Sequence, residues 1–334
     1  APPGHRPRRV RVDLSSAEGR AAALSSPAQA IRHLAHDHYQ KMSSGAIEEL
    51  TQLLDKGNSV LEARALWLLG AAGPNGLEHV LARRQSADFK FRLLAVRILR
   101  ENHSDFLNTV QPMISDRNPQ VRREIALALK DFSGPAARDS WIQLATQYDG
   151  QDRWYLEALA IGARGKESRL YTDLRHSFPG AWDSKLGRLL WVLHPTESVD
   201  FLKKTLQDKS LKVEQRAEAL TALSAQPSPE VGRFIAGFAM GEAPSQLRAQ
   251  AATELIRQLF SQWEGLRQWS GIEPVLRQAL NWDSVRMQAL DLMGDLGDTV
   301  YTKDVFEQAT AADLPVEVRV EAFRTVGRLG GSDI

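Results

Sequence analysis

An arginine followed by a short apolar segment recurs along this chain at intervals of 28 to 38 residues. The segment is clearest after Arg92 (RLLAVRIL), Arg122 (RREIALAL) and Arg216 (RAEALTAL). The whole arginine series consists of Arg32, Arg64, Arg92, Arg122, Arg153, Arg188, Arg216, Arg248, Arg286 and Arg319. A residue that returns at a fixed period indicates a repeated structural unit rather than one reactive site. We therefore expect an array of similar units.

A second amphipathic segment lies between successive members of the arginine series. Its apolar residues fall at i, i+3, i+4 and i+7, which is the period of one helix face. Examples are residues 46–54, 106–114, 199–206 and 272–280. No run of period-two alternation indicates a strand. The sequence therefore predicts an all-α fold, a right-handed α-solenoid of about ten helical hairpins over residues 27–334. Residues 1–26 are expected to form an extended N-terminal segment.

Proline and glycine mark the expected ends of these helices. Asn118-Pro119, Ser228-Pro229 and Leu314-Pro315 place a proline near a helix start, and Ser26-Pro27 does so before the first repeat. Glycines occur where helices should stop, since glycine adopts the left-handed conformation that ends many helices. These glycines are Gly57, Gly73, Gly165, Gly297 and Gly330.

The recurring arginine is expected to have a structural role. Because it occupies the same position in every unit, it would pair with an acidic side chain or with free carbonyl groups in a neighbouring turn. Such pairs would join adjacent units. Acidic residues at suitable positions are Glu62, Asp88, Asp116, Asp152, Glu214, Asp283 and Glu317. If such a pair were buried, removing one partner would leave the other charge without compensation.

Composition limits the possible functions. Lys and Arg total 42 against 41 for Asp and Glu, so there is almost no net charge to attract nucleic acid. The chain has no cysteine, which excludes zinc–thiolate sites and covalent c-type haem attachment within it. Its longest apolar runs are too short to span a membrane. We therefore expect no nucleic-acid partner, no membrane insertion and no cofactor in this chain.

Residues 116–129 follow the pattern Asp-x-x-Pro-x-Val-Arg-x-x-Ile-x-x-Ala-Leu. This pattern resembles the HEAT repeat, and the similarity extends over about residues 27–330. HEAT motifs are degenerate, so the resemblance implies a fold more than a function.

Residues 2–35, 148–163 and 189–195 resemble the HEAT-repeat region of large secreted proteins of planctomycetes and verrucomicrobia. In that family a membrane-bound-dehydrogenase-like β-propeller precedes the HEAT repeats and a c-type cytochrome domain follows them. The resemblance implies an extracytoplasmic protein of which this chain is the connector. Because the chain lacks a Cys-x-x-Cys-His motif, haem c is implied only for the absent neighbouring domain.

Three groups of residues are candidates for sites. Asp149, Asp152, Trp154 and Tyr155 lie close together, and Trp263 and Trp269 lie in a lengthened repeat. Aromatic rings beside charged groups can bind a protein or a carbohydrate, whereas the alternative is packing between repeats. A third group could bind a divalent metal, or its members could simply be solvated. It consists of His33, His36 and Asp37.

The leading interpretation is a non-catalytic scaffold or protein-interaction domain. Its partners would be domains of the same parent chain or another protein. Two alternatives stay open. One is a HEAT-like nucleic-acid enzyme of the DNA glycosylase type, which would need basic residues concentrated on one face. The other is a carbohydrate-binding module that uses the exposed aromatic rings.

Overall fold

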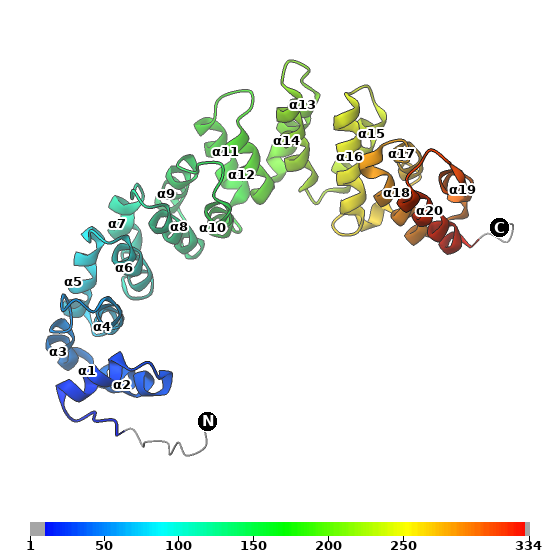
Figure 1. The fold of residues 1–334 in the computed structure, drawn as a ribbon. Coiled ribbons are helices and arrows are strands. Elements are labelled where there is room, and N and C mark those ends of the chain that lie inside the picture. Colours follow the sequence, from blue (N-terminus) through cyan, green and yellow to red (C-terminus); the bar gives the residue numbers. More distant parts are fainter. Residues whose placement is uncertain (1–10, 331–334) are drawn as a thin grey trace, which may run out of the picture. The chain divides into compact units, whose positions relative to one another are not determined.

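The computed structural model describes residues 11–330, and within them it contains helices, turns and loops but no strand (Figure 1). Contacts between residues divide the chain into two compact units, residues 1–147 and 148–334. The expected all-α solenoid is confirmed, because between residues 11 and 330 twenty α-helices follow one another as ten successive pairs.

The first unit contains nine α-helices within its described residues. They are α1 (Ala17–Ser25), α2 (Gln29–Met42), α3 (Ile47–Thr51), α4 (Ser59–Ala71), α5 (Pro74–Ala82), α6 (Phe89–Asn102), α7 (Phe106–Val110), α8 (Pro119–Ala128) and α9 (Pro135–Thr146). Short 3-10 helices extend several of them: η1 (Ser43–Ala46), η2 (Arg83–Gln85), η3 (Gln111–Met113) and η4 (Leu129–Asp131).

The second unit contains eleven α-helices within its described residues. They are α10 (Arg153–Ala163), α11 (Glu167–Ser177), α12 (Ser184–Leu193), α13 (Val199–Gln207), α14 (Val213–Ser224), α15 (Pro229–Met240), α16 (Ser245–Leu259), α17 (Ile272–Ala279), α18 (Asp283–Leu296), α19 (Thr302–Thr310) and α20 (Val316–Leu329). Its 3-10 helices are η5 (Thr196–Ser198), η6 (Glu264–Leu266) and η7 (Thr299–Tyr301).

The even-numbered helices carry the arginine series and pack against one another in succession. In the first unit α2 contacts α4, α4 contacts α6, and α6 contacts α8. In the second unit the same succession runs from α10 through α12, α14, α16 and α18 to α20 (Figure 1). The odd-numbered helices pack beside them, for example α13 on α14 and α19 on α20. Each unit is therefore built of two rows of helices with an apolar layer between them.

Helix α6 shows how the sequence produces this arrangement. The Asp88 side chain accepts a hydrogen bond from the backbone N–H of Lys90 at 2.9 Å and caps the helix start. Ala95, Val96 and Leu99 then lie on one buried face at the helical period. Where α6 packs against α4, Ile98 of α6 lies opposite Gly70 of α4. A Cβ atom on Gly70 would lie 2.2 Å from Cγ2 of Ile98, so these helices approach more closely than alanine would allow.

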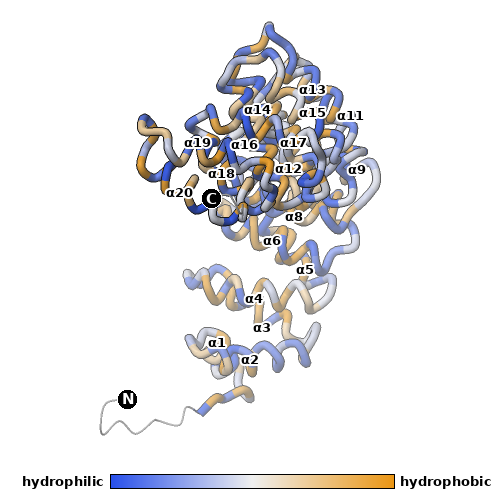
Figure 2. Tube along the Cα trace, turned by 90° about the vertical axis from the view of Figure 1, so that its right-hand side faces the viewer, coloured by the Kyte–Doolittle hydropathy of each residue, from blue (hydrophilic) through white to orange (hydrophobic). Residues whose placement is uncertain are grey.

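Hydropathy differs between neighbouring helices of the first unit. Figure 2 shows mostly hydrophilic colours along α2 and mainly hydrophobic colours along α4. Helix α4 buries Ala65, Leu66, Leu68 and Leu69, whereas α2 buries Ala35 and Tyr39. The second helix of the array is therefore less deeply covered than the fourth.

The structure differs from the expected N-terminal boundary. The N-terminal segment is not extended throughout, because α1 occupies Ala17–Ser25 and the Ser16 side chain caps it at Gly19 N, 3.1 Å away. Residues 1–10 of that segment lie outside the described residues. The sequence did not predict the grouping of contacts into two compact units, residues 1–147 and 148–334.

Helix ends agree with the local signals in most places. Asn118 caps α8 through a hydrogen bond from Gln120 N at 2.8 Å, and α15 begins at Pro229. Gly297 and Gly330 end α18 and α20 with φ of 65° and 64°, the conformation that favours glycine. Before the first repeat the start lies later than expected, because α2 begins at Gln29 rather than after Ser26.

Candidate interaction surface

Most members of the arginine series donate hydrogen bonds to backbone carbonyl oxygens. The last carbonyls of a helix have no partner within that helix, so they are natural acceptors for a cation. The distances are 3.0 Å from Arg32 to Ser26 O, 2.7 Å from Arg64 to Leu24 O, 2.8 Å from Arg92 to Ser86 O, 2.6 Å from Arg122 to Asp116 O, 2.8 Å from Arg216 to Leu206 O, 2.9 Å from Arg248 to Ala239 O and 2.6 Å from Arg286 to Leu280 O.

The direction of these bonds corrects the expectation that every arginine joins one unit to the next. Arg216, Arg248 and Arg286 each bond a carbonyl at the end of the preceding helix of their own hairpin. Two arginines do reach another hairpin. Arg92 bonds the Asp116 side chain, and Arg64 bonds the carbonyl of Leu24. For five of the ten arginines, which are Arg32, Arg122, Arg216, Arg248 and Arg286, the bonds to carbonyl oxygens therefore close the arginine's own hairpin.

The expected acidic partners are correct at two positions. Asp116 pairs with Arg92, and Asp283 pairs with Arg286 at 2.7 Å. Glu62 instead pairs with Arg83 at 2.9 Å, a residue outside the series.

Asp88 and Asp152 have a different role from the one expected. Both accept hydrogen bonds from backbone N–H groups at helix starts, Asp88 from Lys90 and Asp152 from Tyr155. They therefore cap helices, which is a local role that the repeat spacing alone did not distinguish.

Two members of the series are exposed to solvent, and for Arg153 the structure does not support the structural prediction. The Arg153 side chain is 81% exposed and lies 3.9 Å from Glu157. Its guanidinium also lies 6.0 Å from the ring of Trp154. Arg188 is likewise exposed and lines a cavity on α12. Burial raises the pKa of the Tyr148 hydroxyl group, but the guanidinium of Arg188 lies close enough to oppose part of this rise. Arg319 is half-buried, and its Nε atom has no hydrogen-bond partner among the described residues.

The candidate group around residue 152 is only partly available for binding. Tyr155 is buried at 2% exposure and stacks with Tyr148 at a centroid distance of 6.1 Å, so its assignment to a surface is wrong. Asp149 accepts hydrogen bonds from two backbone N–H groups, which lower the pKa of its carboxyl group. Trp154 is different, with 68% of its surface exposed. Helix α10 thus turns Tyr155 toward the core and Trp154 toward the solvent.

The lengthened repeat at residues 258–274 buries one of its two tryptophans. Trp263 is 1% exposed and donates a hydrogen bond from Nε1 to Gln226 O at 3.0 Å, so its assignment to a surface is also wrong. Trp269 is half-buried, and the guanidinium of Arg233 lies 5.9 Å from its ring centroid. The extra residues of this repeat therefore place Trp263 in the core, and they do not form an open aromatic surface.

The three metal candidates do not form one ligand set. His33 Nε2 lies 3.5 Å from a carboxylate oxygen of Asp37, and both side chains are largely exposed. His36 lines a cavity together with His33. Among residues 11–330, no group of three or more His, Asp or Glu side chains is placed to hold a metal ion.

A cavity of about 270 Å³ lies between α12 and α14 in the second unit. Trp191 forms one wall and is 41% exposed, and Arg188 lies one helical turn before it. On the other side, Glu218 accepts hydrogen bonds from Trp182 Nε1 and Ser184 Oγ, both at 2.8 Å. The site therefore combines an aromatic ring, a cation and a fixed carboxylate.

Sequence analysis did not assign Trp191 to a site, although a signal was present. Leu189, Leu190 and Leu193 are buried, so the period of α12 places residues 188 and 191 on the opposite face. Helix α10 contacts α12 and carries the exposed pair Arg153 and Trp154. We define the tryptophan–arginine surface as these four exposed residues, which are Arg153, Trp154, Arg188 and Trp191.

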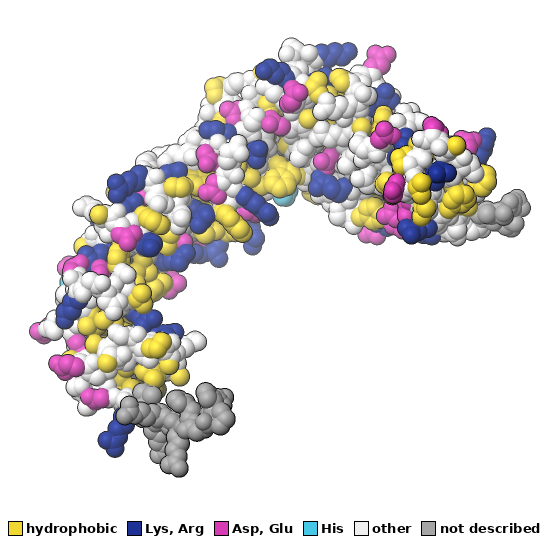
Figure 3. Space-filling model, in the orientation of Figure 1, with side chains coloured by type: hydrophobic (Ala, Val, Ile, Leu, Met, Phe, Trp, Pro, Cys, Tyr) yellow, Lys and Arg dark blue, Asp and Glu magenta, His cyan; other side chains and the backbone are white. Residues whose placement is uncertain are grey.

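Charges of both signs occur over the described surface. In Figure 3 Lys and Arg side chains are interspersed with Asp and Glu side chains on the visible face of each unit. Among the described residues, no helix is both long and apolar enough to cross a membrane.

No protein-family model matches this sequence, and no curated protein matches it. Solved structures show likeness at low identity. An engineered protein has 17% identity and a TM-score of 0.33, over 94% of this chain and 89% of its own. Importin beta has 14% identity and a TM-score of 0.45, and Kap121p has 11% identity and a TM-score of 0.36.

The chain spans 52% of the importin beta chain and 41% of the Kap121p chain. Because all three TM-scores lie below 0.5, the fold assignment depends on the helix pairing and contacts described above.

Proposed function

We propose that this chain is a non-catalytic scaffold whose tryptophan–arginine surface binds a segment of another protein. The observation that carries the proposal is the exposure of Arg153 and Arg188. Most other members of the arginine series bond backbone carbonyls, whereas these two face the solvent beside exposed tryptophans. Positions where a repeated residue loses the contacts made by the other members of the series are expected at functional sites. Arg153 and Arg188 are such positions, and they lie on the neighbouring helices α10 and α12.

The chemistry of the tryptophan–arginine surface indicates the partner. Tryptophan and arginine dominate the binding energy of protein interfaces, because the ring buries a large area and the guanidinium forms several directed hydrogen bonds. Trp154 and Trp191 would contact apolar or aromatic side chains of the partner. Arg153 and Arg188 would pair with its carboxylates. The surface therefore suits a segment that combines acidic with aromatic or aliphatic residues.

An array of immobilised peptides tests this proposal. We expect the chain to bind peptides that combine Asp or Glu with Phe or Leu, and to bind basic peptides of equal length much less. The double variant Arg188→Ala, Trp191→Ala should lose this binding. The matched control is Phe306→Ala, which removes an exposed aromatic ring of the same unit outside the tryptophan–arginine surface.

Two outcomes would reject a protein partner at this surface. One is equal binding of acidic and basic peptides, and the other is unchanged binding by the double variant. Binding to a glycan array that Trp154→Ala abolishes would favour the carbohydrate-binding alternative instead.

We further propose that this scaffold lies between two domains of a larger secreted protein. The proposal is that the chain connects a dehydrogenase-like propeller with a c-type cytochrome domain. The similarity of residues 2–35, 148–163 and 189–195 supports it, and haem would belong to the neighbouring domain because this chain has no cysteine. Sequencing the gene on both sides tests the proposal, which requires a propeller upstream and a Cys-x-x-Cys-His motif downstream.

A further inference from the structure

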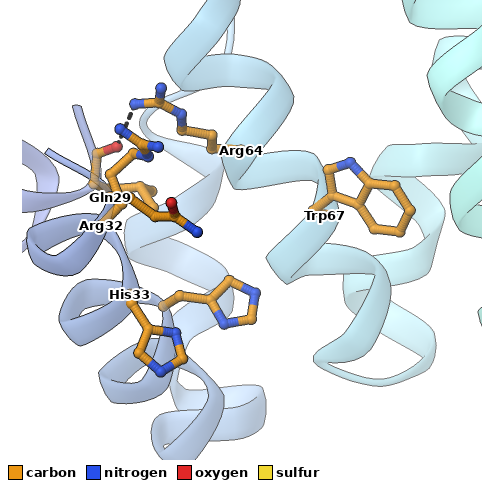
Figure 4. A pocket seen from close by; sticks show the side chains of 7 residues that line it. Gln29, Arg32, His33, Arg64 and Trp67 are labelled. Carbon is orange, nitrogen blue, oxygen red and sulfur yellow. Dashed lines mark hydrogen bonds between the residues drawn. The ribbon is translucent and has the colours of Figure 1, made fainter. Parts of the chain in front are cut away.

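An open cavity of about 380 Å³ lies in the first unit, where α1, α2 and α4 contact one another. Side chains of α1, α2 and α4 line it, and Figure 4 shows Arg32 and Arg64 on one side, His33 below them and Trp67 across the space. The lining residues used in the argument are Gln29, Arg32, His33, His36, Arg64 and Trp67.

Among the described residues, the two guanidinium groups at this cavity lack an acidic partner. Arg32 donates from Nη1 to the carbonyl oxygens of Ser26 and Pro27, and Arg64 donates from Nη1 to that of Leu24. Within residues 11–330, neither guanidinium forms an ion pair with a carboxylate. Burial lowers the pKa of Arg64, and the nearby charge of Arg32 lowers it further. The cavity therefore has a local excess of positive charge.

The next arginine of the series, Arg92, has an acidic partner of the kind that Arg32 and Arg64 lack among the described residues. Arg92 forms two hydrogen bonds with the carboxylate of Asp116, and this pairing raises the pKa of Arg92. Asp116 stands six residues before Arg122, the following member of the series. The residue six positions before Arg92 is Ser86, which carries no charge.

Arg64 points in a different direction from Arg92, and the position that corresponds to Asp116 in its case, Ser86, carries no carboxylate. Arg92 reaches forward along the chain to Asp116, whereas Arg64 bonds back to Leu24 of α1 and lies beside Arg32. Two cations from successive arginine-bearing helices thus meet at one cavity. Such an arrangement is stabilised when an anion enters between them.

The remaining walls restrict what the anion can be attached to. Trp67 and Leu24 supply apolar surface, and Gln29 and His36 supply polar contacts near the arginines. His33, which also lines the cavity, has its Nε2 atom 3.5 Å from a carboxylate oxygen of Asp37. The volume of the cavity lies within the range of sites for small molecules. A ligand with a flat or branched apolar body and one anionic end matches these walls.

We infer that this cavity binds a carboxylate carried on an aromatic or aliphatic body. The carboxylate would pair with Arg32 and Arg64, as Asp116 pairs with Arg92, and the apolar body would lie against Trp67. A free aryl-alkanoic acid and the carboxy-terminal residue of a peptide share this chemistry. The site lies in the first unit and is independent of the tryptophan–arginine surface.

Calorimetry on the full chain tests the inference with 3-phenylpropionate and its neutral counterpart, 3-phenylpropanamide. We expect the acid to bind at least about tenfold more tightly than the amide, since only the acid forms charge-assisted hydrogen bonds. The acid should also shift the indole N–H resonance of Trp67, identified by its loss in Trp67→Phe. Equal binding of the two compounds, or no binding of the acid, would overturn the inference.

A substitution outside the cavity gives a sharper test that avoids removing either arginine. Ser86→Asp supplies the carboxylate that Asp116 supplies in the next repeat, so Arg64 should turn toward it and leave the cavity. We expect acid binding to weaken at least about tenfold without a loss of thermal stability. Ser86→Asn is the matched neutral control and should bind like the parent chain. Unchanged acid binding by a folded Ser86→Asp variant would contradict the inference.

The tripeptide Ala-Ala-Phe distinguishes the two sources of the carboxylate. Tighter binding of the free-acid tripeptide than of 3-phenylpropionate would assign the cavity to a chain terminus, and the reverse order would assign it to a small acid. The tripeptide amide is the control for the peptide body. If the amide bound as tightly as the free-acid tripeptide, the carboxylate would not be the recognised group and the inference would fail.

Discussion

Arg92 donates two hydrogen bonds to the carboxylate of Asp116, from Nε at 2.7 Å and from Nη2 at 2.8 Å. The two side chains are only 7% and 8% exposed. The same guanidinium also bonds the carbonyl oxygens of Ser86 and Ala87. One side chain therefore connects the start of its own helix α6 with the turn that precedes α8.

Removing Asp116 should destabilise the first unit strongly. Asp116→Ala leaves Arg92 buried without its carboxylate, and we expect a loss of about 3–5 kcal/mol in the free energy of unfolding. Urea denaturation measures this loss. Asp283→Ala is the control, because Asp283 is 91% exposed where it pairs with Arg286 and should contribute less than about 1 kcal/mol. Equal effects of the two substitutions would refute the role given to the buried pair.

The two kinds of arginine in the series should differ in their effect on stability. Arg216 is 5% exposed and bonds Leu206 O, so Arg216→Ala should cost about 1–3 kcal/mol through the lost hydrogen bond and the lost packing. Arg153 is almost fully solvated, so Arg153→Ala should change stability by no more than about 0.5 kcal/mol. Both values come from urea denaturation. A large loss in Arg153→Ala would restore the structural role that the repeat alone predicts.

Close approach of α4 and α6 requires a glycine at position 70. Gly70→Ala would place a Cβ atom 2.2 Å from Ile98, and we expect a loss of about 1–3 kcal/mol as the two helices move apart. Gly237→Ala is the matched control, because nothing lies within 4 Å of the added atom on α15. Because alanine has a higher helix propensity than glycine, Gly237→Ala should stabilise the chain by about 0.5–1 kcal/mol. Thermal unfolding of both variants checks the opposite signs, and a tolerated Gly70→Ala would contradict the close packing.

Stability of the first unit should fall in acid because of Glu49. Burial alone would raise the pKa of Glu49, but hydrogen bonds from Arg20 and Tyr39 outweigh it and hold the pKa below its usual value of 4.5. A depressed pKa contributes stability that is complete above the unfolded-state value and is lost as the pH falls through the folded-state value. Glu49→Gln should therefore lower the free energy of unfolding at about pH 7 and have a shrinking effect below about pH 4.5.

Urea denaturation at a series of pH values measures this difference. Glu48→Gln is the control, because Glu48 is the neighbouring acidic residue on α3, whereas the hydrogen bonds from Arg20 and Tyr39 go to Glu49. A Glu49→Gln effect that stayed constant down to about pH 3 would show that the stabilisation does not come from the ionised carboxylate.

The helices and their ends followed from local signals. The period of α6 placed Ala95, Val96 and Leu99 on one face, and packing with α4 and α8 buries that face. Helix ends at Gly297 and Gly330 were also predictable, because the left-handed conformation is a property of a single residue. Helix α1 was missed because its nine residues have no sustained apolar face and it follows a segment rich in proline and arginine.

The candidate surface was less predictable than the fold. Trp154 and Tyr155 are adjacent aromatic residues with opposite burial, which depends on the rotation of α10 against its neighbours. Trp263 was assigned to a surface, yet its indole bonds a carbonyl 37 residues earlier in the chain. Burial of a single large side chain depends on contacts that sequence spacing does not describe.

By itself, the sequence determined that the chain is a row of helical hairpins, because hydrophobic period, proline and glycine act over a few neighbouring residues. Only the tertiary structure decided what each recurring arginine does. Arg64, Arg92 and Arg153 occupy the same phase of the repeat, yet one faces a cavity, one meets a buried carboxylate and one is solvated. The physical reason is that the energy of a charge depends on the groups around it in space, and tertiary packing decides which groups those are.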